Sequence, residues 1–199
     1  MKLHSSRNST YCRRVRVALH EKGVEVEEVD TPKAERETPA YRELNPWGRI
    51  PVLVDGDLVL FESSAILQYV EERFPEPPLV PSDAAGRALV AMHVKLCDLE
   101  YAPHAVAIQR PKRFRPRETW DHEAMARARD PIAAHYAILE HQLAGGDWLV
   151  ADRFTHADLA YLPFLHFHEL LEVDLPPRVM AWWERMSRRP SARATEPEM

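Results

Sequence analysis

The chain contains 199 residues, with a mass of 23.0 kDa, a formal net charge of -5 and a pI of about 6.1. This length suits one large domain or two small ones, and the acidic balance argues against a protein that coats nucleic acids, which is usually basic. The absence of a long apolar run or a signal-peptide pattern predicts a cytoplasmic protein without a membrane span. The two cysteines, Cys12 and Cys97, are too few for a disulfide framework, which is typical of a reducing compartment.

A cluster of prolines at residues 75–81 is the best candidate for a domain boundary. Proline cannot continue a helix and favours an extended linker. The predicted division is therefore a first domain at residues 1–76, a proline-rich linker at 77–82 and a second domain at 83–199.

Before the linker, short strands alternate with helical segments. Cys12, Val15 and Leu19 recur at helical spacing, and the Asp-Gly step at Gly56 lies between two apolar runs, as in a hairpin. The pattern predicts a small mixed sheet with helices packed on it. In chain order, the predicted elements are a strand at Lys2–Ser5, a helix at Thr10–Lys22, strands at Val24–Val29, Pro51–Val54 and Leu58–Phe61, and a helix at Ser64–Phe74.

After the linker the pattern is helical throughout, which predicts an all-helical domain. Pro103, Pro131 and Pro163 fall inside predicted helices, where we expect bends or breaks. The predicted helices span Asp83–Gln109, Glu123–Leu143, Thr155–Leu171 and Pro176–Arg188.

Ser9 and Cys12 stand where the first predicted strand turns into the first helix. A helix start presents unpaired N–H groups and a partial positive charge, which stabilise a thiolate or an oxyanion. Ser9 is a candidate anion contact or, equally, an ordinary helix cap. Cys12 is either a thiol of lowered pKa or a small buried apolar residue, and its spacing to Val15 and Leu19 favours the second interpretation.

Two further segments also lie at strand ends. Ile50–Pro51 precedes a strand, and a cis bond there would expose the backbone of Ile50 to a ligand, although trans proline is the commoner case. Glu62 and Ser63 precede a helix whose start could receive a ligand carboxylate, while Ser63 or Ser64 could equally be a simple cap.

Together these segments resemble the N-terminal, thioredoxin-like domain of the cytosolic glutathione transferases, in a Ser-type form similar to the theta and zeta branches and to bacterial members. The resemblance continues past the linker, in a capping-box pattern and in the last predicted helix. It rests on five strings: Ser9–Arg16, Asn45–Pro51, Glu62–Ile66, Phe154–Asp158 and Trp182–Pro190.

The resemblance implies the glutathione transferase fold, an α/β thioredoxin-like domain followed by an all-α helical bundle. It implies that the first domain binds glutathione as co-substrate and that the second forms the pocket for the other substrate. The residues carried over are Ser9 for activation of the sulfur, Ile50 beside a cis Pro51 for the cysteinyl backbone, Glu62 and Ser63 for the γ-glutamyl end, Arg49 for the glycyl carboxylate, and Tyr11 or Cys12 as further sulfur contacts.

The implied activity is attack of the glutathione thiolate on a small hydrophobic electrophile, as in detoxification, by a homodimer. One alternative is a non-catalytic interaction module similar to stringent starvation protein A. Another is a glutathione-dependent thiol–disulfide or isomerase activity. Thioltransferase-like relatives carry Cys at the position of Ser9, so the disulfide reaction is disfavoured, although Cys12 occupies the resolving position.

Four residues on or after the long helix that follows the linker are candidates for the second-substrate pocket: Tyr101, His104, Ile108 and Phe114. For His104, a packed or solvated histidine is the favoured alternative. Residues 110–117 carry five basic side chains, which either attract an anion or an acidic partner or form a solvated loop, the latter being favoured. No spacing of His, Cys or carboxylates predicts a metal site.

Overall fold

A computed structural model describes residues 1–198 of the chain. The chain folds into two compact units, one formed by Met1–Leu79 with the segment that begins at Arg189, the other by Val80–Arg188. The sequence pattern had instead placed all of residues 83–199 in the second domain. The difference arises because the last residues bond to the first helix of the N-terminal unit, as described below.

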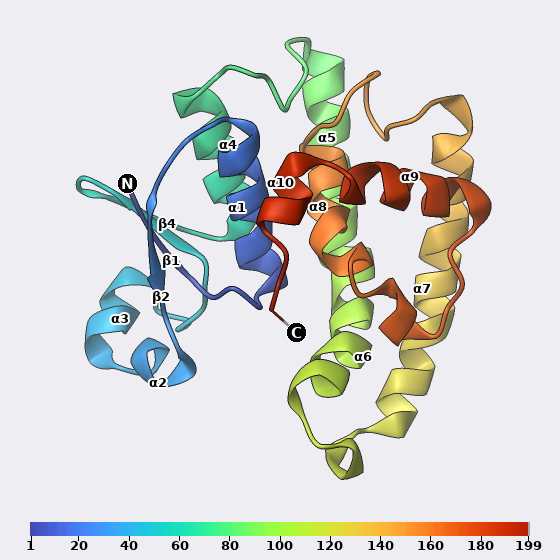
Figure 1. Cartoon of the computed structure of the whole chain (residues 1–199), viewed down its shortest axis with the longest axis horizontal. Helices are drawn as coiled ribbons and strands as arrows, with labels where there is room; N and C mark the ends of the chain where they lie inside the picture. The colour runs from blue at the N-terminus through green and yellow to red at the C-terminus, as the bar shows by residue number, and fades with distance from the viewer. Residues whose placement is uncertain (199) are drawn as a thin grey trace. The chain divides into compact units, whose positions relative to one another are not determined.

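The first unit is built on a four-stranded sheet with strand order β2-β1-β3-β4 (Figure 1). The strands are β1 (Lys2–Ser5), β2 (Glu27–Asp30), β3 (Val52–Asp55) and β4 (Leu58–Phe61). β1 pairs in parallel with β2 and antiparallel with β3, which pairs antiparallel with β4. The bounds predicted for β1 and β4 are confirmed, whereas β2 begins three residues later than predicted.

Two helices, α1 (Thr10–Glu21) and α4 (Ser63–Arg73), pack side by side on this sheet. Leu3 of β1 and Leu53 of β3 meet Val15, Leu19, Ile66 and Val70 in one buried cluster. The apolar stripe predicted for α1 therefore forms the core between sheet and helices.

Two short helices were not predicted, α2 (Lys33–Arg36) and α3 (Pro39–Leu44). α2 has four residues, none of them buried, so it has no apolar period from which a helix could be recognised. α3 begins with a Thr38 cap that accepts the N–H of Tyr41 at 3.3 Å, and it buries only Tyr41.

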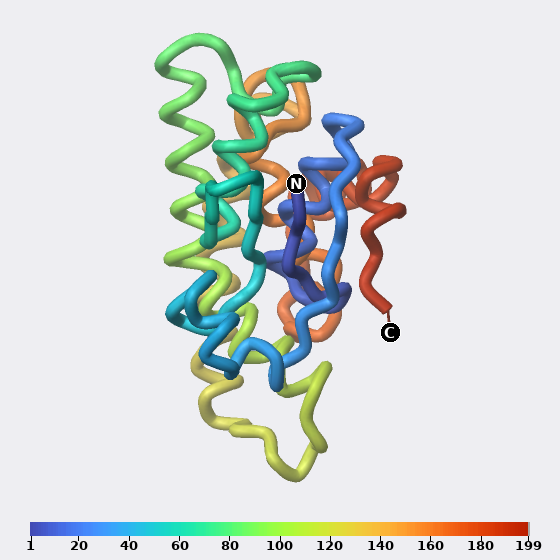
Figure 2. Tube along the Cα trace, turned by 90° about the vertical axis from the view of Figure 1, so that its left-hand side faces the viewer, coloured from blue at the N-terminus to red at the C-terminus, as the bar shows by residue number. Residues whose placement is uncertain are grey.

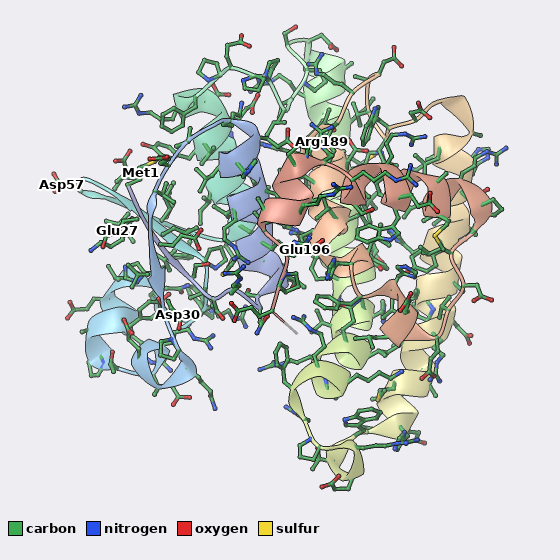
Figure 3. All side chains as sticks on the ribbon, in the orientation of Figure 1. Met1, Glu27, Asp30, Asp57, Arg189 and Glu196 are labelled. Carbon is green, nitrogen blue, oxygen red and sulfur yellow. The ribbon has the colours of Figure 1, made fainter. Side chains whose placement is uncertain are left out.

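The C-terminal segment carries a short helix, α10 (Pro190–Ala194), which lies beside α1 in both views (Figures 1 and 2). Arg189, labelled in Figure 3, donates two hydrogen bonds to the Glu21 carboxylate, at 2.7 and 2.8 Å. Buried Arg13 donates to the carbonyl of Ala192 at 2.9 Å. Charged side chains on α1 thus hold the end of the chain against the N-terminal unit.

A buried ion pair fixes the chain where the first unit ends. Lys22 lies 2.5 Å from the carboxylate of Glu71 and also donates to the carbonyl of Pro77 at 2.9 Å. Glu71 in turn accepts the backbone N–H of Leu79 at 3.1 Å. The proline-rich segment is therefore bonded to α1 and α4 up to Leu79.

The second unit is helical, as predicted. Its α-helices are α5 (Ala84–Leu96), α6 (Ala102–Phe114), α7 (His122–Gln142), α8 (His156–Leu165) and α9 (Pro177–Ser187). A π-helical turn η1 (Cys97–Tyr101) joins α5 to α6, and 3-10 turns lie at η2 (Arg117–Thr119), η3 (Leu143–Gly145) and η4 (His168–Leu171). No helix of the described residues is long and apolar enough to cross a membrane.

The interior prolines act differently from one another. The irregular turn η1 precedes Pro103, which occupies the first turn of α6, where its missing N–H costs little. α7 runs through Pro131 as one helix, so of the bend or break expected there the structure has no break. α8 contains Pro163 and ends at Leu165, earlier than predicted, and the remaining residues form η4.

Asp158 is the polar centre of the second unit. With Thr155 it forms the predicted capping box at the start of α8, where it accepts the Thr155 N–H at 2.8 Å. The same buried carboxylate accepts the N–H of Leu149 at 3.0 Å and the indole N–H of Trp182 at 2.9 Å. Burial raises the pKa of this carboxyl, and these hydrogen bonds oppose the increase.

Candidate functional site

The strand register brings the three segments singled out in the sequence to one edge of the sheet. His4 of β1 is paired with Val52 of β3, and Val52 is paired with Phe61 of β4. The turn to Ser9 follows the end of β1, Ile50–Pro51 precedes β3, and Glu62 follows β4. Two segments that lie about 40 and about 50 residues after Ser9 in the chain therefore end in one row with it across the sheet.

Ser9 is the N-cap of α1, with extended backbone and a half-buried side chain. Its Oγ accepts the N–H of Cys12 at 3.3 Å, and its own N–H donates to the carbonyl of Ser6 at 3.0 Å. No acidic residue lies in the first turn of α1, so the positive end of this 12-residue helix is not offset locally. The Ser9 hydroxyl therefore caps the helix through its oxygen, while its O–H can still donate a hydrogen bond to a ligand.

Cys12 faces the core, with 0% of its surface exposed. Burial raises the pKa of its thiol, and hydrogen bonds with Ser9, Ser6 and Ser5 oppose this increase only in part. The structure therefore does not support Cys12 as a redox group or a sulfur contact, and it agrees with the favoured interpretation of a small buried residue. Tyr11 is half-buried instead, with the guanidinium of Arg14 5.2 Å from its ring centre.

The loop before β3 is held by hydrogen bonds to one carbonyl. The Ile50–Pro51 bond is cis, as the resemblance implied. Tyr41 Oη and Asn45 Nδ2 each donate to the carbonyl of Arg49 at 2.9 Å, and burial raises the pKa of Tyr41 to about 12. These bonds orient the backbone next to Ile50, whereas the Arg49 side chain is exposed.

Gly48 is required in this loop for two reasons. Its φ is +60°, a conformation that side chains disfavour. A Cβ at this position would lie 2.7 Å from the carbonyl oxygen of Arg36. Another residue here would displace the loop that leads to Ile50.

Glu62 and Ser63 occupy the junction between β4 and α4. Glu62 is exposed and adopts φ 71°, and it serves as the N-cap position without a side-chain cap bond. Ser63 is the first helical residue and is buried, so neither it nor Ser64 is the cap considered from the sequence. Its Oγ accepts from the guanidinium of Arg14 at 3.5 Å. The positive φ of Glu62 is strained for a residue with a side chain, and residues strained in this way cluster at ligand sites.

The strain at Glu62 can be tested with two substitutions that remove the same carboxylate. We expect Glu62→Gly to be more stable to urea than Glu62→Ala by about 1 kcal/mol, because only glycine adopts positive φ freely. Both should lose any ligand contact of the carboxylate equally. Equal stability of the two variants would show that the backbone at this position is not strained.

The sequence pattern did not reveal three residues that support the site, namely Arg14, Tyr41 and Asn45. Arg14 is fully buried between Tyr11 and Ser63, although charged residues are seldom buried. No sequence signal distinguishes it from its neighbour arginines. Asn45 lies within the matching string Asn45–Pro51. Its place before Pro46 and Gly48 is typical of a turn and could have indicated its role.

Of the four candidates for the second-substrate pocket, two are buried, one is half-buried and one is exposed. Tyr101 and Ile108 belong to the core and are 0% exposed, and Tyr101 Oη lies 3.0 Å from Tyr136 Oη. This corrects their assignment as substrate contacts. His104 is half-buried and Phe114 is 56% exposed, with Arg113 against its ring at 4.6 Å.

His135 belongs to the same buried cluster as Tyr101. Its ring stacks on that of Tyr101 at 5.4 Å, and its Nε2 lies 3.0 Å from Tyr161 Oη. Burial lowers the pKa of His135 to about 4, so this ring is neutral at neutral pH. Within residues 1–198, no three His, Cys, Asp or Glu side chains gather as metal ligands would.

Comparison with known families matches both units. The family model described as "Glutathione S-transferase, N-terminal domain" matches residues 3–78, and "Glutathione S-transferase, C-terminal domain" matches residues 101–190. Glutathione S-transferase F10 of Arabidopsis thaliana is 32% identical over 188 residues, covering 89% of this chain and 87% of the relative. A stringent starvation protein A homolog of Pasteurella multocida is 51% identical, but over only 82 residues, 41% of this chain and 38% of that protein.

The solved structures agree with these matches. The theta class glutathione S-transferase of Xanthomonas axonopodis pv. citri, crystallised with glutathione bound, superposes with a TM-score of 0.91 at 28% identity, covering 100% of this chain and 97% of that one. Glutathione transferase F2 from Populus trichocarpa superposes with a TM-score of 0.88 at 26% identity, covering 98% and 96%. The chain therefore belongs to the glutathione S-transferase family of transferase enzymes.

Proposed function

We propose that this transferase binds glutathione at the sheet edge and uses the Ser9 hydroxyl to hold its sulfur as a thiolate. The observation that carries the proposal is the position of Ser9, a half-buried N-cap at the start of α1 whose O–H can donate. A hydrogen bond and a helix start both favour the charged form of a nearby thiol. Family membership and the glutathione-bound theta-class structure support the same ligand.

The proposed reaction is a substitution at carbon. The thiol proton leaves to solvent, the thiolate sulfur forms a bond to an electrophilic carbon, and the leaving group departs with its bonding electrons. Ser9 stays unmodified and donates its hydrogen bond throughout. The burial of Cys12 disfavours a disulfide reaction in its place.

The other contacts of glutathione are proposed from the same edge. The backbone of Ile50, oriented by the bonds to Arg49, would pair with the cysteinyl unit. Glu62 and Ser63 would receive the γ-glutamyl end, the carboxylate pairing with its ammonium group and the start of α4 with its carboxylate. The exposed Arg49 side chain is the candidate for the glycyl carboxylate.

We also propose that the chain forms a homodimer. Exposed apolar side chains support this, because Leu89, Met92 and Leu99 are 46%, 42% and 66% exposed along α5 and η1. These three recur at intervals that keep them near one face of a helix. Light scattering of the purified protein measures this state directly.

Glutathione titration tests the proposed function. Thiolate absorbance, followed against pH in the presence of saturating protein, should give a bound thiol pKa below that of free glutathione. S-Methylglutathione is the matched control, since it should bind without the absorbance change. If no binding is detected at millimolar glutathione, the proposal is wrong.

A non-catalytic interaction module is the second candidate. It is favoured by the 51% identity, over 82 residues, with the stringent starvation protein A homolog. The two candidates differ in the titration, because an interaction module need not bind glutathione or lower its thiol pKa. Binding without turnover of any electrophile class would favour the module.

A further inference from the structure

The turn that leads from β1 into α1 is held by a residue that is not among the proposed glutathione contacts. Ser9 donates its N–H to the carbonyl of Ser6 at 3.0 Å, which closes a four-residue β-turn with Arg7 and Asn8 at its centre. Arg16, about two turns further along α1, donates a hydrogen bond from Nη2 to the carbonyl of Arg7 at 2.7 Å. The acceptor is therefore the carbonyl of the peptide between the two central residues of the turn.

Arg16 is buried although it bears a charge. Only 8% of this residue is exposed, and within residues 1–198 the Arg7 carbonyl accepts its one hydrogen bond, while its Nε has no partner. A guanidinium placed in the interior with so few partners contributes little net stability, because its desolvation is costly. The position of Arg16 is therefore better explained by the peptide that it orients than by the stability of the fold.

The hydrogen bond acts on the part of the turn that can rotate. Type I and type II turns differ in ψ at the first central residue and in φ at the second, so the peptide between these residues rotates when one form changes into the other. The type II form needs positive φ at the second position, which asparagine tolerates better than most residues. Asn8 is not among the described residues with positive φ, so the sequence permits a second turn form that the bond from Arg16 disfavours.

Ser9 occupies the last position of this turn. On its helical side it is fixed by α1, where its Oγ accepts the N–H of Cys12 at 3.3 Å. On its other side only the turn fixes it, so rotation of the central peptide loosens that side. A reacting group that is displaced by about 1 Å can lose ~100-fold in rate, so the direction of the Ser9 hydroxyl matters for catalysis.

We propose that Arg16 is a positioning residue for the Ser9 hydroxyl and acts through the carbonyl of Arg7. The inference rests on the proposed role of Ser9 as the group that holds the glutathione sulfur. It adds that a buried donor on α1 selects the turn form in which this hydroxyl is aligned, without contacting the sulfur itself.

Replacing Arg16 with methionine removes the donor and keeps a long side chain. We expect kcat for conjugation of a reactive aryl halide at pH 6 to fall about 3- to 10-fold, and the pKa of bound glutathione to rise by about 0.5–1 unit. KM for glutathione should change less than about 2-fold, because the binding contacts are kept. Thermal unfolding should shift by less than about 4 °C, since the buried cation contributes little stability.

Two further variants at this position complete the test. Arg16→Lys keeps the charge and a donor, so it should recover most of the lost kcat. Arg16→Gln, whose amide reaches less far, replaces Arg16→Met in every comparison if the methionine variant does not fold.

A pair of substitutions at Asn8 separates the geometry of the turn from the charge of Arg16. Asn8→Gly and Asn8→Thr both remove the amide side chain, but glycine adopts positive φ freely and threonine does not. In the Arg16→Met background we expect the glycine variant to have a kcat about 3-fold below that of the threonine variant, in keeping with the conformational preference of glycine. With Arg16 present, the two should differ less than about 2-fold, because the bond holds the turn.

Glu198→Gln is the matched control, because Glu198 contacts Arg7 without touching its carbonyl. Its carboxylate lies 3.4 Å from Nε of Arg7, and both side chains are exposed. Loss of this pair should change kcat less than about 2-fold, as for a screened surface ion pair.

Three results would overturn the inference: an unchanged thiol pKa in Arg16→Met, no recovery by Arg16→Lys, or equal activity of the two Asn8 variants in the Arg16→Met background. Ser9→Ala is measured in parallel. If Ser9→Ala raises the thiol pKa while Arg16→Met does not, the proposed function stands and only the role of Arg16 falls. If Ser9→Ala leaves the thiol pKa unchanged, the proposed role of Ser9 is wrong and the inference falls with it.

Discussion

Replacing Ser9 with alanine is expected to raise the pKa of glutathione bound to the protein by about 1–2 units and to lower kcat/KM about 10- to 100-fold. The reason is the loss of one hydrogen bond to a charged sulfur, which contributes about 1.5–3 kcal/mol. Helix α1 also loses the cap that accepts the Cys12 N–H, so stability should fall by about 1 kcal/mol. Thiolate absorbance measures the pKa, and conjugation of a reactive aryl halide measures turnover.

Two control variants separate the sulfur contact from the cap. Ser9→Thr keeps both the hydroxyl and the cap, so it should recover most of the activity. Thr10→Ala removes the neighbouring hydroxyl and should change the thiol pKa little. If Ser9→Ala conjugates as fast as the wild type, Ser9 is not the group that activates the sulfur.

Replacing Asp158 with alanine is expected to give the largest loss of stability, about 4 kcal/mol. Its buried carboxylate accepts hydrogen bonds from Leu149, Trp182 and both the N–H and hydroxyl of Thr155. Each buried donor left without an acceptor costs about 1–3 kcal/mol, partly recovered when the site relaxes. Urea unfolding, with its slope compared between variants, measures the change in the free energy of unfolding.

Graded variants identify the origin of this loss. Trp182→Phe removes one donor and should cost about 1 kcal/mol. Asp158→Asn keeps the shape of the side chain but turns an N–H₂ group toward hydrogen-bond donors. Its loss of stability should therefore lie between those of Trp182→Phe and Asp158→Ala. A loss below about 1 kcal/mol for Asp158→Ala would contradict the assigned network.

The elements with a strong local pattern were predictable. Helix α1 has a cap, an apolar stripe and a terminal glycine, and the β3–β4 hairpin has an Asp-Gly turn, so local chemistry specified both. Capping by Thr155 and Asp158 was predicted for the same reason, because a capping box depends on residues three apart. The short helices α2 and α3 lack such a period, and they were missed.

Residues that act across long sequence distances were not predictable. Arg14 reaches Ser63, 49 positions along the chain, and Arg13 reaches Ala192, 179 positions along. Neither partner can be chosen from local spacing. The same limit explains why Tyr101 and Ile108 were taken as pocket residues, since periodicity gives the face of a helix and not what covers it.

The sequence by itself determined the family, the mixed sheet and the helical second half, because these depend on local patterns and on five matching strings. It also identified the three segments of the candidate site. It did not show that they lie together at one end of the sheet, which follows from the register that pairs His4 with Val52 and Val52 with Phe61. Spacing already favoured a buried Cys12, whereas only the tertiary structure decided that Ser9 is half-buried and that the last residues belong with the first unit. The physical reason is that burial and long-range hydrogen bonds depend on which elements pack together, and packing is a property of the whole fold.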